Sequence, residues 1–179
     1  MHPTVALVLD SPHSGHDFPP DFNAIVGEAE LRESEDCYVD ELYAAAHELG
    51  APLLAASFPR TYLDPNRHAG DVDLELIEGR LPSDWLWEYR PSGKARIGKS
   101  LIWRTLEDGR PIYGRKLLPE AVCKRIERCH APYHRDLQEH LDAAHRRFGP
   151  IDHDDVGQHA AGPQRLGNPG RGLGGNVLV

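Results

Sequence analysis

The amino-acid sequence predicts an α/β fold, and three features of the 179-residue chain point to it. Two short apolar runs, at residues 5–9 and 52–58, are typical of buried parallel strands, because strands covered on both faces read as continuous apolar stretches. One helical pattern lies between these runs, and a longer one extends over residues 119–148. Strands that alternate with helices in this way are typical of a parallel sheet covered by helices.

The first strand is expected at residues 5–9 and to stop before Pro12, which has no N–H group to donate to a sheet. A loop over residues 13–20 follows. The first helix is expected to end at Gly50, because glycine is a common helix terminator. The apolar side of this helix, at spacings of three and four residues, consists of Tyr38, Leu42, Ala45 and Leu49.

Residues 68–118 are rich in glycine, proline, tryptophan and charge, so they give few regular patterns. They contain one expected strand, at 100–104, and one expected hairpin, around 107–109. The long helix is expected to begin at Pro119, since proline suits the first helical position. Pro132 lies inside that helix and predicts a kink or a break, because proline removes a helical hydrogen bond.

Length and composition limit the class of protein. The length suits one domain with its own hydrophobic core. The net charge is −8 and no basic stripe is visible, so a nucleic acid is not an expected partner. The first ten residues have no cationic stretch and only a short apolar run, which predicts a cytoplasmic protein without a membrane partner. The odd number of cysteines has no paired spacing, so reduced thiols are expected at Cys37, Cys123 and Cys129.

The first candidate site lies in the segment 11–16, Ser-Pro-His-Ser-Gly-His, directly after the first expected strand. Sites in α/β sheets form at the carboxyl ends of strands, so His13 is well placed to bind a metal through a ring nitrogen. The alternative is a loop histidine that caps a turn, and the local sequence does not decide between the two.

The second candidate site follows the second expected strand and contains Arg60, Asn66 and Arg67. Two guanidinium groups beside an amide suit the recognition of a carboxylate, because arginine binds carboxylates with two parallel hydrogen bonds. The alternative is a set of ion pairs between these arginines and nearby acids. The acids in question are Asp64, Asp71 and Asp73.

Two further segments carry ionisable groups. The acidic run at 33–36 is expected in the first turn of the first helix, where carboxylates interact favourably with the helix dipole; one of them could instead bind a metal. His130 and His134 flank Tyr133 in the long helix, and the expected arrangement is a kinked helix with a packed tyrosine rather than a catalytic group.

Taken together, five ordered motifs resemble the N-formylglutamate amidohydrolase family over roughly residues 5–149. They are Pro-His-Ser-Gly at 12–15, Glu-Asp-x-Tyr-Val-Asp-x-Leu at 35–42, Arg-x-Tyr-x-Asp-x-Asn-Arg at 60–67, Ile-Tyr-Gly-Arg at 112–115 and Pro-Tyr-His-x-x-Leu at 132–137. The family is similar in fold to zinc carboxypeptidases and aspartoacylases. The resemblance implies a three-layer αβα, carboxypeptidase-like (phosphorylase/hydrolase-like) fold with a mixed sheet.

The resemblance also implies roles for individual residues. His13 is expected to be a ligand of one Zn²⁺ ion per chain, and Arg60 to polarise the scissile carbonyl group. Asn66 and Arg67 are expected to hold the carboxylate of the substrate. Similar carboxypeptidase sites use His-x-x-Glu for their first two ligands, but the third residue after His13 is a histidine. Asp36 is therefore the expected second ligand, with His16 as the alternative.

The chain departs from the family pattern after the long helix. Family members resemble one another in a segment Asp-x-His-Ser-Met-Pro whose histidine is the third zinc ligand, but Gly157 stands at that position, two residues after Asp155. Residues 157–179 contain no acidic residue and no lysine, and seven of these 23 residues are glycine. If residues 158–161, Gln-His-Ala-Ala, are encoded by CAG-CAT-GCC-GCC, the same bases read Ser-Met-Pro in a frame shifted by one base.

We therefore expect a family domain at residues 1–156 that is incomplete at its C-terminus, and a tail at 157–179 that is out of frame. The alternative is a diverged tail in which His153 or His159 supplies the third zinc ligand. The implied activity is the metal-dependent hydrolysis of N-formyl-L-glutamate, or of a similar acyl amino acid, within histidine breakdown. A second hypothesis is an inactive remnant that binds small carboxylates without a competent metal. The oligomeric state and the preferred acyl group stay open.

Overall fold

The protein is described here by a computed structural model that defines residues 3–149, 151–153 and 175–178. The strands in these ranges form one sheet in the order β2-β1-β4-β3, and every neighbouring pair is parallel. Their bounds are β1 (Leu7–Ser11), β2 (Leu53–Ala55), β3 (Ile151–His153) and β4 (Gly175–Leu178). The two parallel strands expected near the N-terminus are confirmed, although β1 begins and ends two residues later than expected and β2 is shorter.

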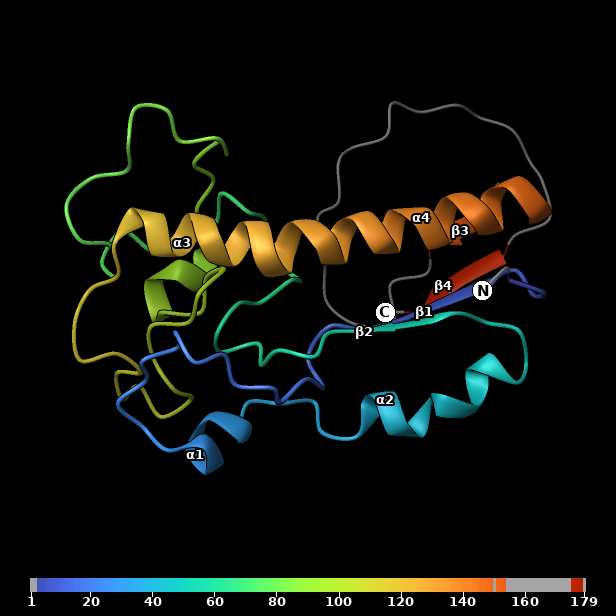
Figure 1. The fold of residues 1–179 in the computed structure, drawn as a ribbon, viewed down its shortest axis with the longest axis horizontal. Helices are drawn as coiled ribbons and strands as arrows, with labels where there is room; N and C mark the ends of the chain where they lie inside the picture. Colours follow the sequence, from blue (N-terminus) through green and yellow to red (C-terminus); the bar gives the residue numbers. More distant parts are fainter. Residues whose placement is uncertain (1–2, 150, 154–174, 179) are drawn as a thin grey trace.

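Helices lie on both sides of this sheet, with α4 on one side and α2 on the other (Figure 1). The α/β fold expected from the sequence is therefore confirmed. The helical segments are α1 (Glu28–Arg32), α2 (Val39–Leu42), the 3₁₀ helices η1 (Ala44–His47) and η2 (Gly93–Ile97), α3 (Pro119–Arg125), the π-helical η3 (Ile126–His130) and α4 (Ala131–Phe148). None of the helices in the described ranges is long and apolar enough to cross a membrane.

The first expected helix differs from the prediction in two ways: it is not one regular α-helix, and it buries a different face. It consists of α2 and η1, and its expected apolar side is exposed, with Tyr38, Leu42 and Leu49 at 65, 75 and 71%. The tighter 3₁₀ turn changes which residues face inward. As a result Ala46, which the pattern did not select, packs against Leu9 of β1. The expected stop at Gly50 is confirmed by its φ of +79°.

The long helical segment runs without a break from α3 through η3 to α4 (Figure 1). Pro119 begins it and Gly149, at φ +85°, follows its last residue, both as expected. A kink or a break was expected at Pro132, and the structure excludes the break, because the helical segment is continuous there. Proline lacks the N–H group and clashes with the carbonyl four residues earlier, and the wider π-helical turn of η3 lies at that position.

The region 68–118 contributes most of the main hydrophobic core despite its irregular backbone. The expected strand at 100–104 is wrong, because the chain reverses there and Lys99 forms an isolated antiparallel bridge with Trp103. The expected hairpin is confirmed: Thr105 pairs with Pro111 across a turn that contains Gly109 at φ +86°. Leu101 and Ile112 of this region form one core cluster with Val122 of α3 and Ile126 of η3, and each of the four is 0% exposed.

Candidate active site

Two loops meet at the carboxyl ends of β1 and β2. Ala56 N–H donates to the carbonyl of Ser11 (3.0 Å), and Asp17 N–H donates to that of Ser57 (2.8 Å). Gly15 lies so close to the second loop that a Cβ atom there would be 2.4 Å from the carbonyl oxygen of Ala56. Only glycine fits this approach, which places the neighbouring His13 over the ends of both strands.

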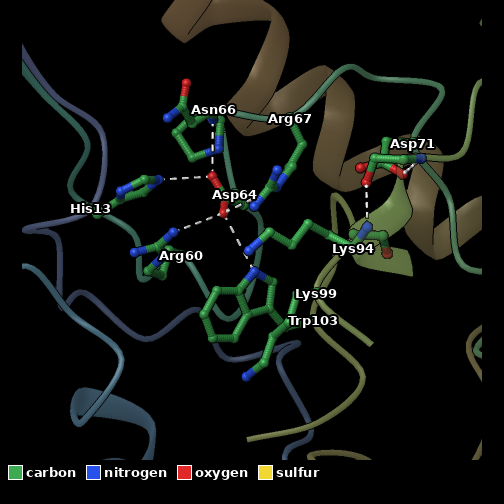
Figure 2. A network of polar contacts seen from close by, with 12 residues as sticks. His13, Arg60, Asp64, Asn66, Arg67, Asp71, Lys94, Lys99 and Trp103 are labelled. Carbon is green, nitrogen blue, oxygen red and sulfur yellow. Dashed lines mark hydrogen bonds and ion pairs between the residues drawn. The ribbon is translucent and has the colours of Figure 1, made fainter. Parts of the chain in front are cut away.

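His13 is buried and lies between two carboxylates. Its Nδ1 atom is 3.1 Å from Oδ2 of Asp36. Its Nε2 atom is 2.8 Å from Oδ1 of Asp64 (Figure 2). The backbone adds a third contact, since Asp36 N–H donates to the carbonyl of His13 (3.1 Å). The imidazole ring therefore has a defined orientation.

Asp64 is the centre of the cluster and is 0% exposed. Figure 2 shows side chains from several parts of the chain converging on its carboxylate. Besides His13, its partners are Nη2 of Arg60 (3.2 Å), Nε of Arg67 (3.7 Å), Nε1–H of Trp103 (3.4 Å) and the backbone N–H of Asn66 (3.0 Å). A buried carboxylate requires such partners, because burying an unpaired charge is very unfavourable.

These contacts control protonation. Burial alone would raise the pKa of Asp64, but the hydrogen bond and charge of His13 and the two arginines outweigh it and lower that pKa to about 2. Burial alone would lower the pKa of His13, but hydrogen bonds to Asp36 and Asp64 outweigh it and raise that pKa. The hydrogen bond from His13 also lowers the pKa of Asp36. The cluster therefore favours a charged imidazole ring between two carboxylates.

Arg60 joins the two carboxylates. In addition to its contact with Asp64, its Nη1 atom is 3.5 Å from Oδ1 of Asp36, and its guanidinium carbon is 4.9 Å from the ring centre of Trp103. The ammonium group of Lys99 lies 3.8 Å from the centre of the same ring. Both cations gain from the electron-rich ring, and the ring in turn restricts where Arg60 can lie.

The structure brings most of the predicted site residues into one cluster. His13, Asp36, Arg60 and Arg67 all contact one another or Asp64, and Asn66 joins through its backbone. His16, the alternative ligand, is exposed, and its Nδ1 atom is 3.4 Å from the carbonyl of Ser14. The local ion pairs proposed as the alternative reading of the arginines are also present, through Asp64.

The acidic run at 33–36 is not in the first turn of a helix, so that expectation is wrong. Glu33 caps the C-terminus of α1, and α2 begins only at Val39. The helix dipole therefore does not account for Asp36, whose side chain contacts His13 and Arg60 instead.

Sequence reasoning missed the central role of Asp64. The residue lies inside the Arg-x-Tyr-x-Asp-x-Asn-Arg motif, where local sequence marks it only as one of several acids near the arginines. Its position four residues after Arg60 and three before Arg67 was the available signal, because a short loop can turn both arginines toward one carboxylate.

A second buried carboxylate, Asp10, was also missed. It lies on β1, is 9% exposed, and accepts a hydrogen bond from the hydroxyl of Tyr133 on α4. Burial raises its pKa to about 7, and the nearby His13 opposes that shift. Because the folded-state pKa lies above the unfolded value of 3.8, folding takes up a proton between these pH values.

Replacing Asp10 with asparagine should make stability less dependent on pH. In the parent protein the free energy of unfolding falls as pH rises from about 4 to 7, because the folded state binds more protons than the unfolded state in that interval. A shift from 3.8 to about 7, at roughly 1.4 kcal/mol per pH unit, corresponds to about 4 kcal/mol. Urea denaturation at pH 5 and pH 8 measures this change in the free energy of unfolding. The control is Asp84→Asn, at an exposed position. An equal decline in parent and Asp10→Asn proteins would refute this assignment.

A complete set of metal ligands is not visible in the part of the chain that the structure describes, where no group of three His, Cys, Asp or Glu side chains is placed to hold a metal. His159, Asp155 and Gly157 lie outside the described residues, as does the predicted tail at 157–179 apart from residues 175–178, which form β4. The backbone of His153 belongs to β3. The predicted third ligand therefore stays a prediction.

The fold and this cluster define an α/β protein with a polar site at the carboxyl ends of parallel strands, the usual location of active sites in such sheets. Comparison with known proteins specifies the class further. A family model described as N-formylglutamate amidohydrolase matches residues 5–156. The chain belongs to the N-formylglutamate amidohydrolase family.

Individual relatives agree with this assignment. An N-formylglutamate deformylase of Pseudomonas aeruginosa is 31% identical over 150 residues, which cover 81% of this chain and 48% of the relative. An N-formylglutamate deformylase of Pseudomonas putida is 29% identical over 146 residues, which cover 80% of this chain and 48% of the relative. A crystal structure of an N-formylglutamate amidohydrolase from Ralstonia eutropha JMP134 superposes on this chain with a TM-score of 0.77. The two proteins share 42% sequence identity, and the match covers 86% of this chain and 54% of the other. This chain spans about half the length of the relatives it matches.

Proposed function

We propose that this chain hydrolyses the amide bond of N-formyl-L-glutamate, or of a similar N-acyl amino acid, to formate and the amino acid, with one zinc ion as cofactor. The observation that carries the proposal is the His13–Asp36–Arg60 cluster around Asp64 at the strand ends. It occurs in a chain of the N-formylglutamate amidohydrolase family, whose relatives bear that activity in their names.

The geometry at His13 fits two zinc ligands. Two ligand atoms that each lie about 2.0–2.1 Å from a tetrahedral zinc ion are roughly 3.3 Å apart from each other. The distance from Nδ1 of His13 to Oδ2 of Asp36 is 3.1 Å. Asp64 meanwhile contacts the other ring nitrogen, which is how a carboxylate orients a metal-binding histidine and fixes its tautomer. His13 and Asp36 would therefore hold the ion, and Asp64 would support His13.

Arg60, Asn66 and Arg67 are the groups we assign to the substrate. The side chains of Arg60 and Arg67 are paired with Asp64 but remain 17% and 23% exposed. A guanidinium group carries five N–H donors, more than these contacts use, so each arginine can also donate a hydrogen bond to an oxygen of the substrate. Arg67 and Asn66 would hold the carboxylate of the substrate, because guanidinium and amide groups match its two oxygens.

We assign to Arg60 the stabilisation of charge during the reaction. A bound zinc ion would supply a Lewis acid that lowers the pKa of a water molecule and polarises the acyl carbonyl. The guanidinium group of Arg60, held by Asp36, Asp64 and Trp103, would stabilise the negative charge that develops on the carbonyl oxygen during attack. Because those contacts orient Arg60 in advance, little reorganisation is needed when the charge appears.

The complete architecture is part of the same proposal. Helices on both sides of a sheet are consistent with a three-layer αβα, carboxypeptidase-like fold (Figure 1). The mixed sheet expected for that fold, the domain limits at 1–156 and 157–179, the cytoplasmic location and a role in histidine breakdown belong to the same hypothesis.

Metal content tests the proposal most directly. The full chain is dialysed against trace zinc, bound metal is measured by elemental analysis, and formate release from N-formyl-L-glutamate is assayed. We expect about one zinc per chain and activity in the parent and in His16→Ala, and loss of both in His13→Ala and Asp36→Ala. Circular dichroism confirms that each variant is folded.

Two results would contradict this assignment in different ways. Zinc retained by His13→Ala but lost from His16→Ala would move the ligand to the exposed histidine. A folded parent protein that binds L-glutamate, yet neither takes up zinc nor releases formate, would instead favour the non-catalytic carboxylate binder.

A further inference from the structure

Two histidines of the long helical segment contact the loop that carries Asn66 and Arg67. Nε2 of His130 is 2.8 Å from the carbonyl oxygen of Arg67, and Nε2 of His134 is 2.8 Å from that of Pro65. A carbonyl oxygen only accepts, so each Nε2 atom must carry the hydrogen. The two donors therefore bind the carbonyl groups on either side of Asn66.

The helix presents both rings on one side. His130 is the last residue of η3 and His134 lies in the first turn of α4, a spacing of four residues that places side chains on the same helical face. The ring centres are 4.2 Å apart, so the rings also contact each other. The π-helical turn that ends at His130 is the kind of irregularity that often accompanies functional sites.

The other side of the loop is held by Asp64. Its carboxylate accepts a hydrogen bond from Asn66 N–H (3.0 Å), and its backbone carbonyl accepts one from Arg67 N–H (3.1 Å). The backbone at 65–67 is thus held by Asp64 from one side and by the two histidines from the other. These contacts restrict the directions in which the side chains of Asn66 and Arg67 can leave the chain.

Within the described residues, this pair is not part of a group of three His, Cys, Asp or Glu side chains that could hold a metal. Both Nε2 atoms are occupied by backbone carbonyls, and Nδ1 of the neighbouring His68 accepts a hydrogen bond from Gly70 N–H (3.0 Å). Burial lowers the pKa of His130 to about 4, with the charge of His134 acting in the same direction, and burial also lowers the pKa of His134. Near neutral pH both rings are therefore neutral donors.

We propose that His130 and His134 are positioning residues for substrate recognition: their Nε2–H groups orient the 65–67 backbone so that Asn66 and Arg67 can bind the carboxylate of the substrate. The proposal rests on the proposed function for its substrate. Independently of that substrate, the two Nε2–H groups order the 65–67 backbone whether or not a ligand is bound.

The test replaces each histidine with glutamine and with asparagine in the full chain. Glutamine places its amide nitrogen near the position of Nε2 and can still donate, whereas the shorter asparagine cannot reach the carbonyl. Exposed His145→Asn on the same helix is the matched control. Three quantities are measured: the affinity for N-formyl-L-glutamate and L-glutamate by calorimetry, the kcat and KM of formate release, and the amide hydrogen exchange of Asn66 and Arg67.

We expect His130→Asn and His134→Asn to weaken ligand binding and raise KM by about fivefold or more, as the loss of one hydrogen bond implies, with kcat little changed. Exchange at Asn66 and Arg67 should become faster by a similar factor. The glutamine variants and His145→Asn should resemble the parent protein in every measurement.

The outcomes separate the two proposals. Parent protein that binds neither ligand refutes the proposed function, while hydrogen exchange still decides whether the histidines order the loop. Glutamine variants as impaired as the asparagine variants overturn the positioning role, because the donor would then not be the relevant feature. Unchanged exchange and unchanged KM in both asparagine variants overturn it as well.

Discussion

Replacing Asp64 with asparagine should lower the free energy of unfolding by about 3 kcal/mol at pH 7, because it leaves buried cations without their counter-charge. The Asp64 side chain is 0% exposed, while those of Arg60 and Arg67 are 17% and 23% exposed, so solvent compensates only partly. Asparagine keeps the shape but cannot satisfy His13, two arginines and Trp103 together. On the proposed function, zinc affinity should also fall, roughly tenfold or more, since Asp64 orients His13.

The effect of Asp64→Asn should depend on pH in a defined direction. The pKa of Asp64 is lowered from 3.8 to about 2, so its contribution to stability is fully present above about pH 4 and is lost as pH falls toward 2. Urea denaturation at pH 7 and at pH 3 measures the change. The control is Asp136→Asn, at an exposed ion pair with Arg135, where little change is expected. Equal stability of parent and Asp64→Asn proteins at pH 7 would show that the cluster does not stabilise the fold.

Replacing Arg125 with methionine should be comparably destabilising, by about 3 kcal/mol, for a different reason. Arg125 is 2% exposed and lies 4.0 Å from the ring centre of Tyr62. Its guanidinium group donates to the carbonyl oxygens of Tyr62 (3.0 Å) and Phe22 (3.3 Å) and to the hydroxyl of Tyr113 (2.7 Å). Methionine fills similar space but leaves these buried acceptors unpaired, and their desolvation is then uncompensated.

The matched control for Arg125 is on the same helical segment. Arg128 pairs with Asp21 at 3.2 Å, but its side chain is 58% exposed. Arg128→Met should therefore change the urea midpoint little, while Arg125→Met should lower it clearly without changing the denaturant dependence. If both substitutions have the same small effect, the aromatic and carbonyl environment of Arg125 does not contribute the stability that its burial implies.

Sequence reasoning succeeded where the signal is local. Pro119 begins a helix and Gly149 follows its end, and Gly109 lies in the hairpin turn. Each of these residues acts through its own backbone conformation, which its immediate neighbours largely determine. The continuous apolar runs likewise predicted parallel strands correctly, since burial on both faces is visible in composition.

Local patterns failed where a neighbour in space decides the outcome. The apolar side at Tyr38, Leu42 and Leu49 reads as a buried helix face, yet these residues are exposed and Ala46 packs inward. The apolar stretch at 100–104 reads as a strand, yet it folds back on itself under α3. Periodicity reports amphipathic character, but only tertiary packing decides which side is covered.

The candidate site also has features that the sequence predicts and features that only the tertiary structure decides. The sequence alone determined the α/β class, the family motifs and the individual residues His13, Asp36, Arg60, Asn66 and Arg67. It did not determine that Asp64 lies at their centre, that Asp10 contacts Tyr133 123 residues away, or that His130 and His134 hold the 65–67 loop. The tertiary structure decided these contacts, because parallel pairing of β1 with β2 brings His13 and Asp64, 51 residues apart, to one edge of the sheet. Residue types show which side chains can carry charge, whereas the burial and partners that set their pKa values arise only when distant segments pack together.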